Sequence, residues 1–229
     1  MSNTSNGKAV KGSKMQMQRI TEKENQQILN KLFDDELKWL SPCRKDNYRE
    51  YQLNNPGIKK LLGIKSNVFK DFWPPRQPQW DGIAIGKSGA LYLFEAKSHL
   101  NEIQRSRTDK SELIRNSISH VAYSLTKMDL KSEKEHEIWY HKFYQIANRL
   151  VFLEKMKEIA TLSDKFNDVV LVFLNFVNDR SWEEEKQMVK SSEEWDSHYA
   201  KIFDEMRIDQ STFETINVRI LNVDLDKVV

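Results

Sequence analysis

The hydrophobic positions of the chain switch between helical and strand spacing several times. Apolar residues recur three and four positions apart near 22–37, 111–128 and 137–159, which predicts three helices, and a short helix is expected near 58–62. Thr21 is expected to cap the first helix, with Glu24 as its capping-box partner. An acidic region over about 182–206 is also expected to be helical.

Strand-like patterns lie between these helices. The apolar run at 169–174 is continuous, as in a strand covered on both faces, whereas residues 215–223 alternate. Residues 41–79 hold all five prolines and are expected to be irregular, with 73–78 extended because proline lacks an N–H donor. Strands interleaved with long helices indicate an α/β layer fold.

The sequence QWDGIAIGKSGALYLFEAK, residues 79–97, predicts a β-hairpin. A three-residue loop at 87–89, with Gly89 in the left-handed conformation, sets small residues against large ones across the two strands. The expected pairs are Gly86 with Ala90, Ile85 with Leu91, Ala84 with Tyr92, Ile83 with Leu93, Gly82 with Phe94, Asp81 with Glu95 and Trp80 with Ala96. Asp81, Glu95 and Lys97 then share one sheet face, just beyond its apolar part.

Two carboxylates facing each other beside an apolar surface repel, and they are costly unless a cation joins them. Mg²⁺ suits a site with two carboxylates and water. Lys97 could orient a water there or offset charge on a phosphate. The alternative is an exposed sheet end with ordinary ion pairing.

Asp81, the glycine-bearing turn, the apolar strand and Glu95-Ala96-Lys97 together resemble the PD-(D/E)xK nuclease superfamily, the restriction-endonuclease-like fold. Residues 78–81, read as PQWD, and the Ser98-His99 pair look like a bacterial group of uncharacterised proteins within it. The resemblance rests on about twenty residues, and Trp80 replaces the proline of the motif. It implies an αβββαβ core with a central mixed sheet flanked by helices.

The resemblance also implies metal-dependent phosphodiester hydrolysis. Asp81 and Glu95 would hold Mg²⁺ or Mn²⁺, with the Ala96 carbonyl as a further ligand, and Lys97 would position or activate the attacking water. Many members add an upstream glutamate, for which Glu50 is the candidate and Glu36 a weaker one. A solvated loop acid is the competing interpretation of Glu50.

Other polar residues are candidates for contacts around this site. On the helix near 137–159, Gln145 could hold a water or phosphate and Arg149 could contact a backbone phosphate. Arg76 and His99 are further nucleic-acid candidates, although a solvated polar face and a structural histidine are the ordinary alternatives. Basic residues flank the hairpin on both sides and could line a groove: Lys59, Lys60, Lys65, Lys70, Arg76, Arg105, Arg107 and Lys110. No cysteine–histidine cluster at zinc spacing is present.

Composition limits the classes of protein that remain. The chain has 229 residues and a net charge of +2, but four basic residues and no acid precede Glu22. Residues 1–18 are expected to be a disordered tail and 19–229 a single domain. The single cysteine, Cys43, suits a reducing cytoplasm, and neither a membrane-spanning run nor a signal-peptide core is apparent.

The expected function is therefore a cytoplasmic, Mg²⁺-dependent nuclease whose partner is nucleic acid, DNA before RNA, and which could act as a homodimer. The chain after the four basic residues that precede Glu22 is nearly neutral, which indicates weak or partner-assisted binding to nucleic acid. Two alternatives stay open. One is a non-catalytic nucleic-acid- or protein-binding module on the same fold, and the other is a hydrolase of a different phosphate ester.

Overall fold

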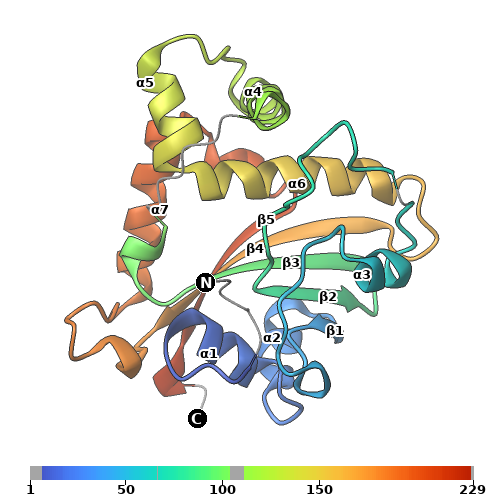
Figure 1. Cartoon of the computed structure of the whole chain (residues 1–229). Helices are drawn as coiled ribbons and strands as arrows, with labels where there is room; N and C mark the ends of the chain where they lie inside the picture. Colours follow the sequence, from blue (N-terminus) through green and yellow to red (C-terminus); the bar gives the residue numbers. More distant parts are fainter. Residues whose placement is uncertain (1–6, 66, 104–110, 228–229) are drawn as a thin grey trace.

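A five-stranded mixed sheet forms the centre of the computed structural model, which describes residues 7–65, 67–103 and 111–227 (Figure 1). The strands lie in chain order: β1 (Leu37–Ser41), β2 (Gly82–Gly86), β3 (Ala90–Lys97), β4 (Asp168–Val177) and β5 (Val218–Asp224). The first three are antiparallel neighbours, and β3, β4 and β5 run parallel. The expected α/β class with a mixed sheet is confirmed.

Helices cover both faces of the sheet (Figure 1). On one face lie α1 (Gly12–Ile20) and α2 (Gln26–Phe33), and on the other lie α4 (Glu112–Thr126), α6 (Tyr144–Ala160) and α7 (Ser192–Met206). Two short helices, α3 (Pro56–Leu61) and α5 (Glu133–His136), and a π-helical segment, Glu137–Lys142, complete the larger elements. The 3₁₀ turns are Arg44–Asp46, Leu100–Glu102, Arg180–Trp182, Gln210–Thr212 and Leu225–Lys227.

The hairpin forms in the predicted register. Ile85 pairs with Leu91, Ile83 with Leu93 and Gly82 with Phe94, and Gly89 has a φ of 89°. Alternation along these strands divides the core. Ile83 and Leu93 face the α4–α6–α7 side, whereas Ala84 and Phe94 pack with α1 and α2. The register was predictable because the turn and the two-residue pleat both act locally.

The expected disordered tail is wrong for residues 12–18. They belong to α1, whose Met17 is 1% exposed and packs on the sheet together with Ile20. Buried glutamines there have polar partners: Gln16 donates to Asp179 at 2.9 Å and Gln18 donates to the Gly7 carbonyl. Burial of so polar a segment depends on these distant groups, which the composition of the segment does not reveal. Residues 1–6 lie outside the described part of the chain.

Several element boundaries also differ from the predictions. The helix expected near 22–37 is only α2, because Asp34 adopts the left-handed conformation and ends it, and the chain then enters β1. Thr21 ends α1 and caps no following helix. The helix near 111–128 is confirmed as α4, the one near 137–159 divides into a π segment and α6, and the helical part of 182–206 is α7 alone.

Candidate functional site

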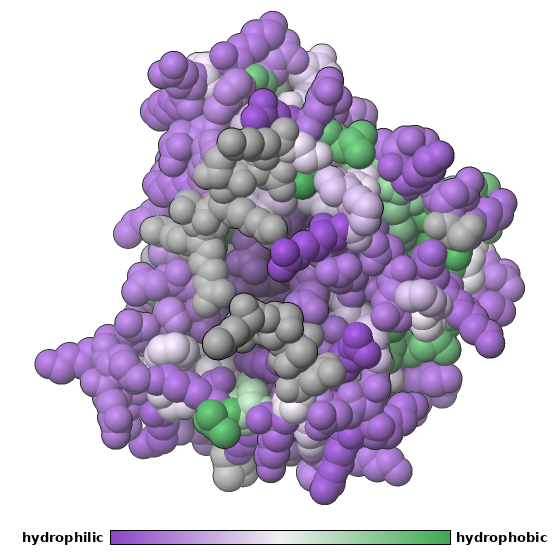
Figure 2. Space-filling view, viewed as in Figure 1, coloured by the Kyte–Doolittle hydropathy of each residue, from purple (hydrophilic) through white to green (hydrophobic). Residues whose placement is uncertain are grey.

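The hairpin charges meet at the edge of the sheet where β2 begins and β3 ends. Asp81 directly precedes β2, and its Oδ2 accepts a hydrogen bond from the Ala96 amide at 2.7 Å. Extending the β2–β3 register by one pair places Asp81 opposite Glu95. The face of the molecule drawn in Figure 2 is mostly hydrophilic and is hollowed near its middle, close to where Figure 1 shows β3 ending.

A third carboxylate joins this pair. Tyr51 forms an antiparallel bridge with Trp80, whose amide donates to the Tyr51 carbonyl at 3.0 Å. Continuing that register by one residue sets Glu50 opposite Asp81. Glu50 is half-buried there, and the Nζ of Lys14 from α1 lies 3.6 Å from its Oε1. The sequence candidate Glu50 is thus brought to the site and is not a solvated loop acid.

Glu95 is 2% exposed and accepts bonds on both carboxylate oxygens. Lys97 and Gln145 both donate to Oε1, the latter at 2.5 Å. Arg149 donates to Oε2 from Nε at 2.6 Å, and its Nη2 forms an ion pair with the same oxygen. Gln145 lies at the start of α6 and Arg149 one turn further, so the helix presents both to the strand end.

Arg149 does not have the expected role of a phosphate contact. Its side chain is 4% exposed, its Nη2 also donates to the Gln79 carbonyl at 2.7 Å, and its guanidinium lies 4.4 Å from the Trp80 ring centre. These contacts commit the guanidinium to the interior, where it is the buried counter-ion of Glu95. A polar position on a helix does not by itself distinguish a solvent-facing arginine from a buried one.

The two facing carboxylates differ in their affinity for protons. Burial, and after it the negative charge of Glu95, raise the pKa of Asp81 to about 8, although Lys97 opposes the shift. For Glu95, burial also opposes ionisation, but the charges of Arg149 and Lys97 outweigh it and lower the pKa. Burial raises the pKa of Glu50, and Lys14 offsets part of that rise. The site therefore holds one carboxylate, Glu95, whose charge is balanced by cations, and two carboxyl groups, Asp81 and Glu50, whose ionisation is disfavoured.

The remaining sequence candidates lie elsewhere or face away. His99 was a candidate for nucleic-acid contact, but it is buried. It pairs with Glu102 at 3.3 Å and packs against the Trp182 ring. Arg76 is exposed and stays a candidate. Glu36 lies at the opposite, turn end of the hairpin beside Lys87. Arg105, Arg107 and Lys110 fall outside the described residues.

The donor set has the chemistry of a hard-cation site, with one condition. Asp81 forms no ion pair within the described residues, and the Oε1 of Gln145 is buried without a hydrogen-bond partner there. Both observations fit an oxygen-ligated divalent ion. Glu95, however, accepts three hydrogen bonds, two of them on Oε1, so it can bind a cation only after Lys97 or Gln145 leaves Oε1. Over the described ranges, no preformed group of three histidine, cysteine or acidic side chains could hold a metal.

Sequence reasoning missed Lys14 and the buried setting of Trp80. The one available signal for Lys14 was the run of basic residues before Glu22, which we expected to be part of a tail. Nothing in the local sequence links that run to Glu50, because the contact spans 36 positions and depends on how α1 docks.

Comparison with protein-family models, curated proteins and solved structures finds no match to this chain. Among the described residues, no helix is both long enough and apolar enough to cross a membrane.

Proposed function

We propose that this protein is a metal-dependent phosphodiesterase of the PD-(D/E)xK type that acts on nucleic acid, with DNA as the first substrate to test. The observation that carries the proposal is the cluster at one sheet edge: Asp81 beside Glu95, Glu50 beside Asp81, and Lys97 donating to Glu95. Metal-dependent phosphodiester hydrolysis of this type needs two carboxylates to bind the metal ion and a lysine near the attacked phosphate. The cluster contains these groups and a third carboxylate.

The order of elements supports the same proposal at a coarser level. A helix, α2, precedes the antiparallel β1–β2–β3 meander, and helices α4 and α6 lead to the parallel strand β4. Apart from the short helix α3 between β1 and β2, this order resembles the αβββαβ succession expected for a restriction-endonuclease-like core, with β5 added beyond it. Element order alone is shared by unrelated chemistries, so the argument rests on the site.

In this proposal Asp81, Glu95 and the Ala96 carbonyl would hold Mg²⁺ or Mn²⁺, and Glu50, opposite Asp81 in the extended strand register, would be the third carboxylate to join them. The bound ion would supply Lewis acidity and a water of lowered pKa. Lys97, released from Glu95, would donate to that water or to a phosphate oxygen. Gln145 would orient the same group through its amide, and Arg149 would keep Glu95 ionised.

A non-catalytic module is the second candidate, and one observation favours it. Both oxygens of Glu95 are filled by protein donors, as in a structural ion-pair network that needs no metal. In that case the same cluster would fix the end of β3 for binding nucleic acid or protein. A cytoplasmic location and a homodimer remain proposals in either case.

The decisive experiment is cleavage of single- and double-stranded DNA and RNA by the full chain in Mg²⁺ or Mn²⁺. We expect wild type to cut at least one form, EDTA to stop it, and Lys97→Ala to reduce the rate by at least about 100-fold, in the range of a lost catalytic group. Lys201→Ala, an exposed lysine on α7, is the matched control and should cut normally. Cleavage that Lys97→Ala leaves intact would sink the proposal, as would a wild type that cuts nothing.

A further inference from the structure

Of the basic residues before Glu22, α1 brings Lys14 against the candidate site. The helix is anchored by tertiary contacts: Gln16 donates to the buried Asp179, the Gly12 amide donates to Ser181 at 3.1 Å, and Lys11 pairs with Glu185. With Met17 in the core, this anchoring fixes the direction in which the other cations of α1 project.

Lys14 differs from the other cations at the carboxylate cluster in its access to solvent. Its side chain is 31% exposed, against 8% for Lys97 and 4% for Arg149. Lys97 and Arg149 are both bonded to Glu95, whereas Lys14 lies at a looser 3.6 Å from Glu50. A phosphate that approaches the cluster meets three carboxylates, and of these three cations Lys14 is the one that it can reach first.

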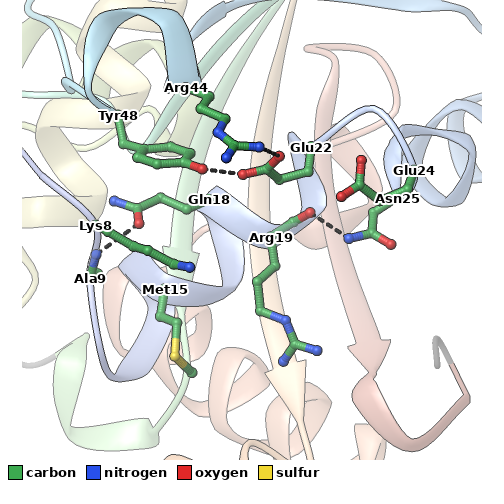
Figure 3. A pocket seen from close by; sticks show the side chains of 10 residues that line it. All are labelled: Lys8, Ala9, Met15, Gln18, Arg19, Glu22, Glu24, Asn25, Arg44 and Tyr48. Atoms are coloured by element: carbon green, nitrogen blue, oxygen red, sulfur yellow. Dashed lines mark hydrogen bonds and ion pairs between the residues drawn. The ribbon is translucent and has the colours of Figure 1, made fainter.

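Beyond Lys14, the same helix forms one wall of a pocket of about 610 Å³. Figure 3 shows the side chains of Lys8, Arg19 and Arg44 around it, with the Tyr48 ring at one side. Arg19 is five residues from Lys14, about 7.5 Å along the helix axis and about 140° around it, so the two side chains project from different faces of α1. Tyr48 is two residues from Glu50, so the pocket and the carboxylate cluster are neighbours along this segment of the chain.

The charges in this pocket favour an anion. Its Glu22 is already engaged, since it accepts a bond from Tyr48 and lies 3.8 Å from Arg44. Lys8 forms no ion pair or hydrogen bond with other described side chains, and Arg19 is exposed. One acidic residue, Glu24, then opposes two available cations, Lys8 and Arg19.

We propose that α1 and the segment before it bind the phosphate backbone of a nucleic-acid strand, with Lys14 contacting the phosphate next to the candidate site and Lys8 and Arg19 contacting the strand in the pocket on the other side of α1. This inference rests on the proposed function, because it assumes that the strand is cut at the carboxylate cluster. Contacts of lysine and arginine to phosphate carry no sequence information, so binding through α1 is not sequence-specific.

The test measures binding apart from cleavage. Asp81→Asn serves as the background in which no strand is cut, and a fluorescent single-stranded DNA 15-mer is titrated at several salt concentrations. Lys14→Ala and Lys8→Ala/Arg19→Ala should each weaken binding by roughly fivefold or more, and each lost phosphate contact should reduce the salt slope by about 0.7. Lys14→Arg should retain binding, and Lys201→Ala on the distant α7 should change neither quantity. Circular dichroism and thermal unfolding establish that each variant is folded.

The outcomes separate this inference from the proposed function. If wild type cleaves nucleic acid but the α1 variants bind like their background, α1 does not bind the strand and the nuclease proposal stands. An equal effect of Lys201→Ala would also overturn the inference, because the binding would then depend on general charge. If the background binds no nucleic acid and wild type cuts none, both proposals fail together.

Discussion

Asp81 and Glu95 are chemically alike and adjacent, yet their surroundings give them opposite roles. Glu95 is held ionised by Arg149 and Lys97, whereas Asp81 receives a single backbone hydrogen bond and faces the charges of Glu95 and Glu50. Pairs of titratable groups with divergent pKa values are common at functional sites. Ionising Asp81 is costly because, among the described residues, no cation pairs with it, so Asp81 is the carboxyl group that a bound cation should stabilise most.

The raised pKa of Asp81 predicts how stability changes with pH. Because the folded state holds this proton up to about pH 8 and the unfolded state releases it near 3.8, the unfolding free energy falls as the pH rises through that window. Asp81→Asn has no carboxyl group to titrate, so its unfolding free energy does not fall in this pH window for that reason. At pH 8 it should be more stable than wild type by at least about 1.4 kcal/mol, the value of one pKa unit. Below pH 4 the two should converge. Thermal unfolding from pH 4 to 9 checks this, and parallel curves for both proteins would contradict it.

Arg149 is predicted to matter through Glu95 rather than through substrate. Arg149→Met leaves the buried Glu95 carboxylate with two of its three hydrogen bonds and without its arginine ion pair, and it should lower the unfolding free energy by about 3 kcal/mol. Adding Glu95→Gln removes the charge and should recover part of that loss. Urea unfolding of both single variants and the double variant measures the coupling. Additive effects would show that the pair does not interact as described.

At the scale of elements, α1 depends on a close approach to the hairpin. A Cβ at Gly82 would lie 2.7 Å from the Met17 side chain, 3.0 Å from Trp39 and 3.2 Å from Phe94. Because Gly82 has no side chain, the end of the Met17 side chain from α1 can pack on the start of β2, one residue from Asp81. The absent side chain at this position couples the docking of α1 to the geometry of the site.

Gly82→Ala should consequently displace α1. We expect a loss of about 1–3 kcal/mol in unfolding free energy, the usual cost of overpacking. Met17→Ala removes the closest atom, so the double variant should lose less than the sum of the single losses. Denaturant unfolding gives the energies, and hydrogen exchange along residues 12–20 reports whether α1 is loosened. Unchanged exchange in Gly82→Ala would contradict the displacement.

At the scale of the whole molecule, the sheet brings together groups from three distant parts of the chain. The bridge between Tyr51 and Trp80 brings Glu50, the β2–β3 hairpin brings Asp81 and Glu95, and packing of α6 against β4 brings Arg149. The two-sided core fixes these elements, because the alternating residues of β3 and β4 pack against helices on both faces. Such rigid support is what a charge cluster at a sheet edge requires.

Metal binding should accordingly stabilise the whole fold. A ligand at 100 times its Kd adds about 2.7 kcal/mol to the unfolding free energy if it binds only the folded state. We expect the Tm of wild type to rise with Mg²⁺ or Mn²⁺ at pH 8, and the Tm of Asp81→Asn and of Glu95→Gln to rise far less. Differential scanning fluorimetry over a metal titration measures this. Equal shifts in all three proteins would place the metal elsewhere.

The hairpin, its register and the nearness of Asp81, Glu95 and Lys97 follow from local sequence alone. These features follow from the loop at 87–89 and from the pleat, which act within twenty residues. The strand at 169–174 and the helix near 111–128 were predictable for the same reason, because a hydrophobic pattern depends only on residues close together in the sequence.

Long-range packing is needed to explain the folding of α1, the place of Lys14 beside Glu50 and the burial of Arg149 against Glu95 and Trp80. Each depends on a partner 30 or more positions away, and each places a polar side chain where its own sequence neighbours give no reason to bury it. The energy that compensates such burial comes from the opposite charge or hydrogen-bond partner, which is present only when the chain is folded.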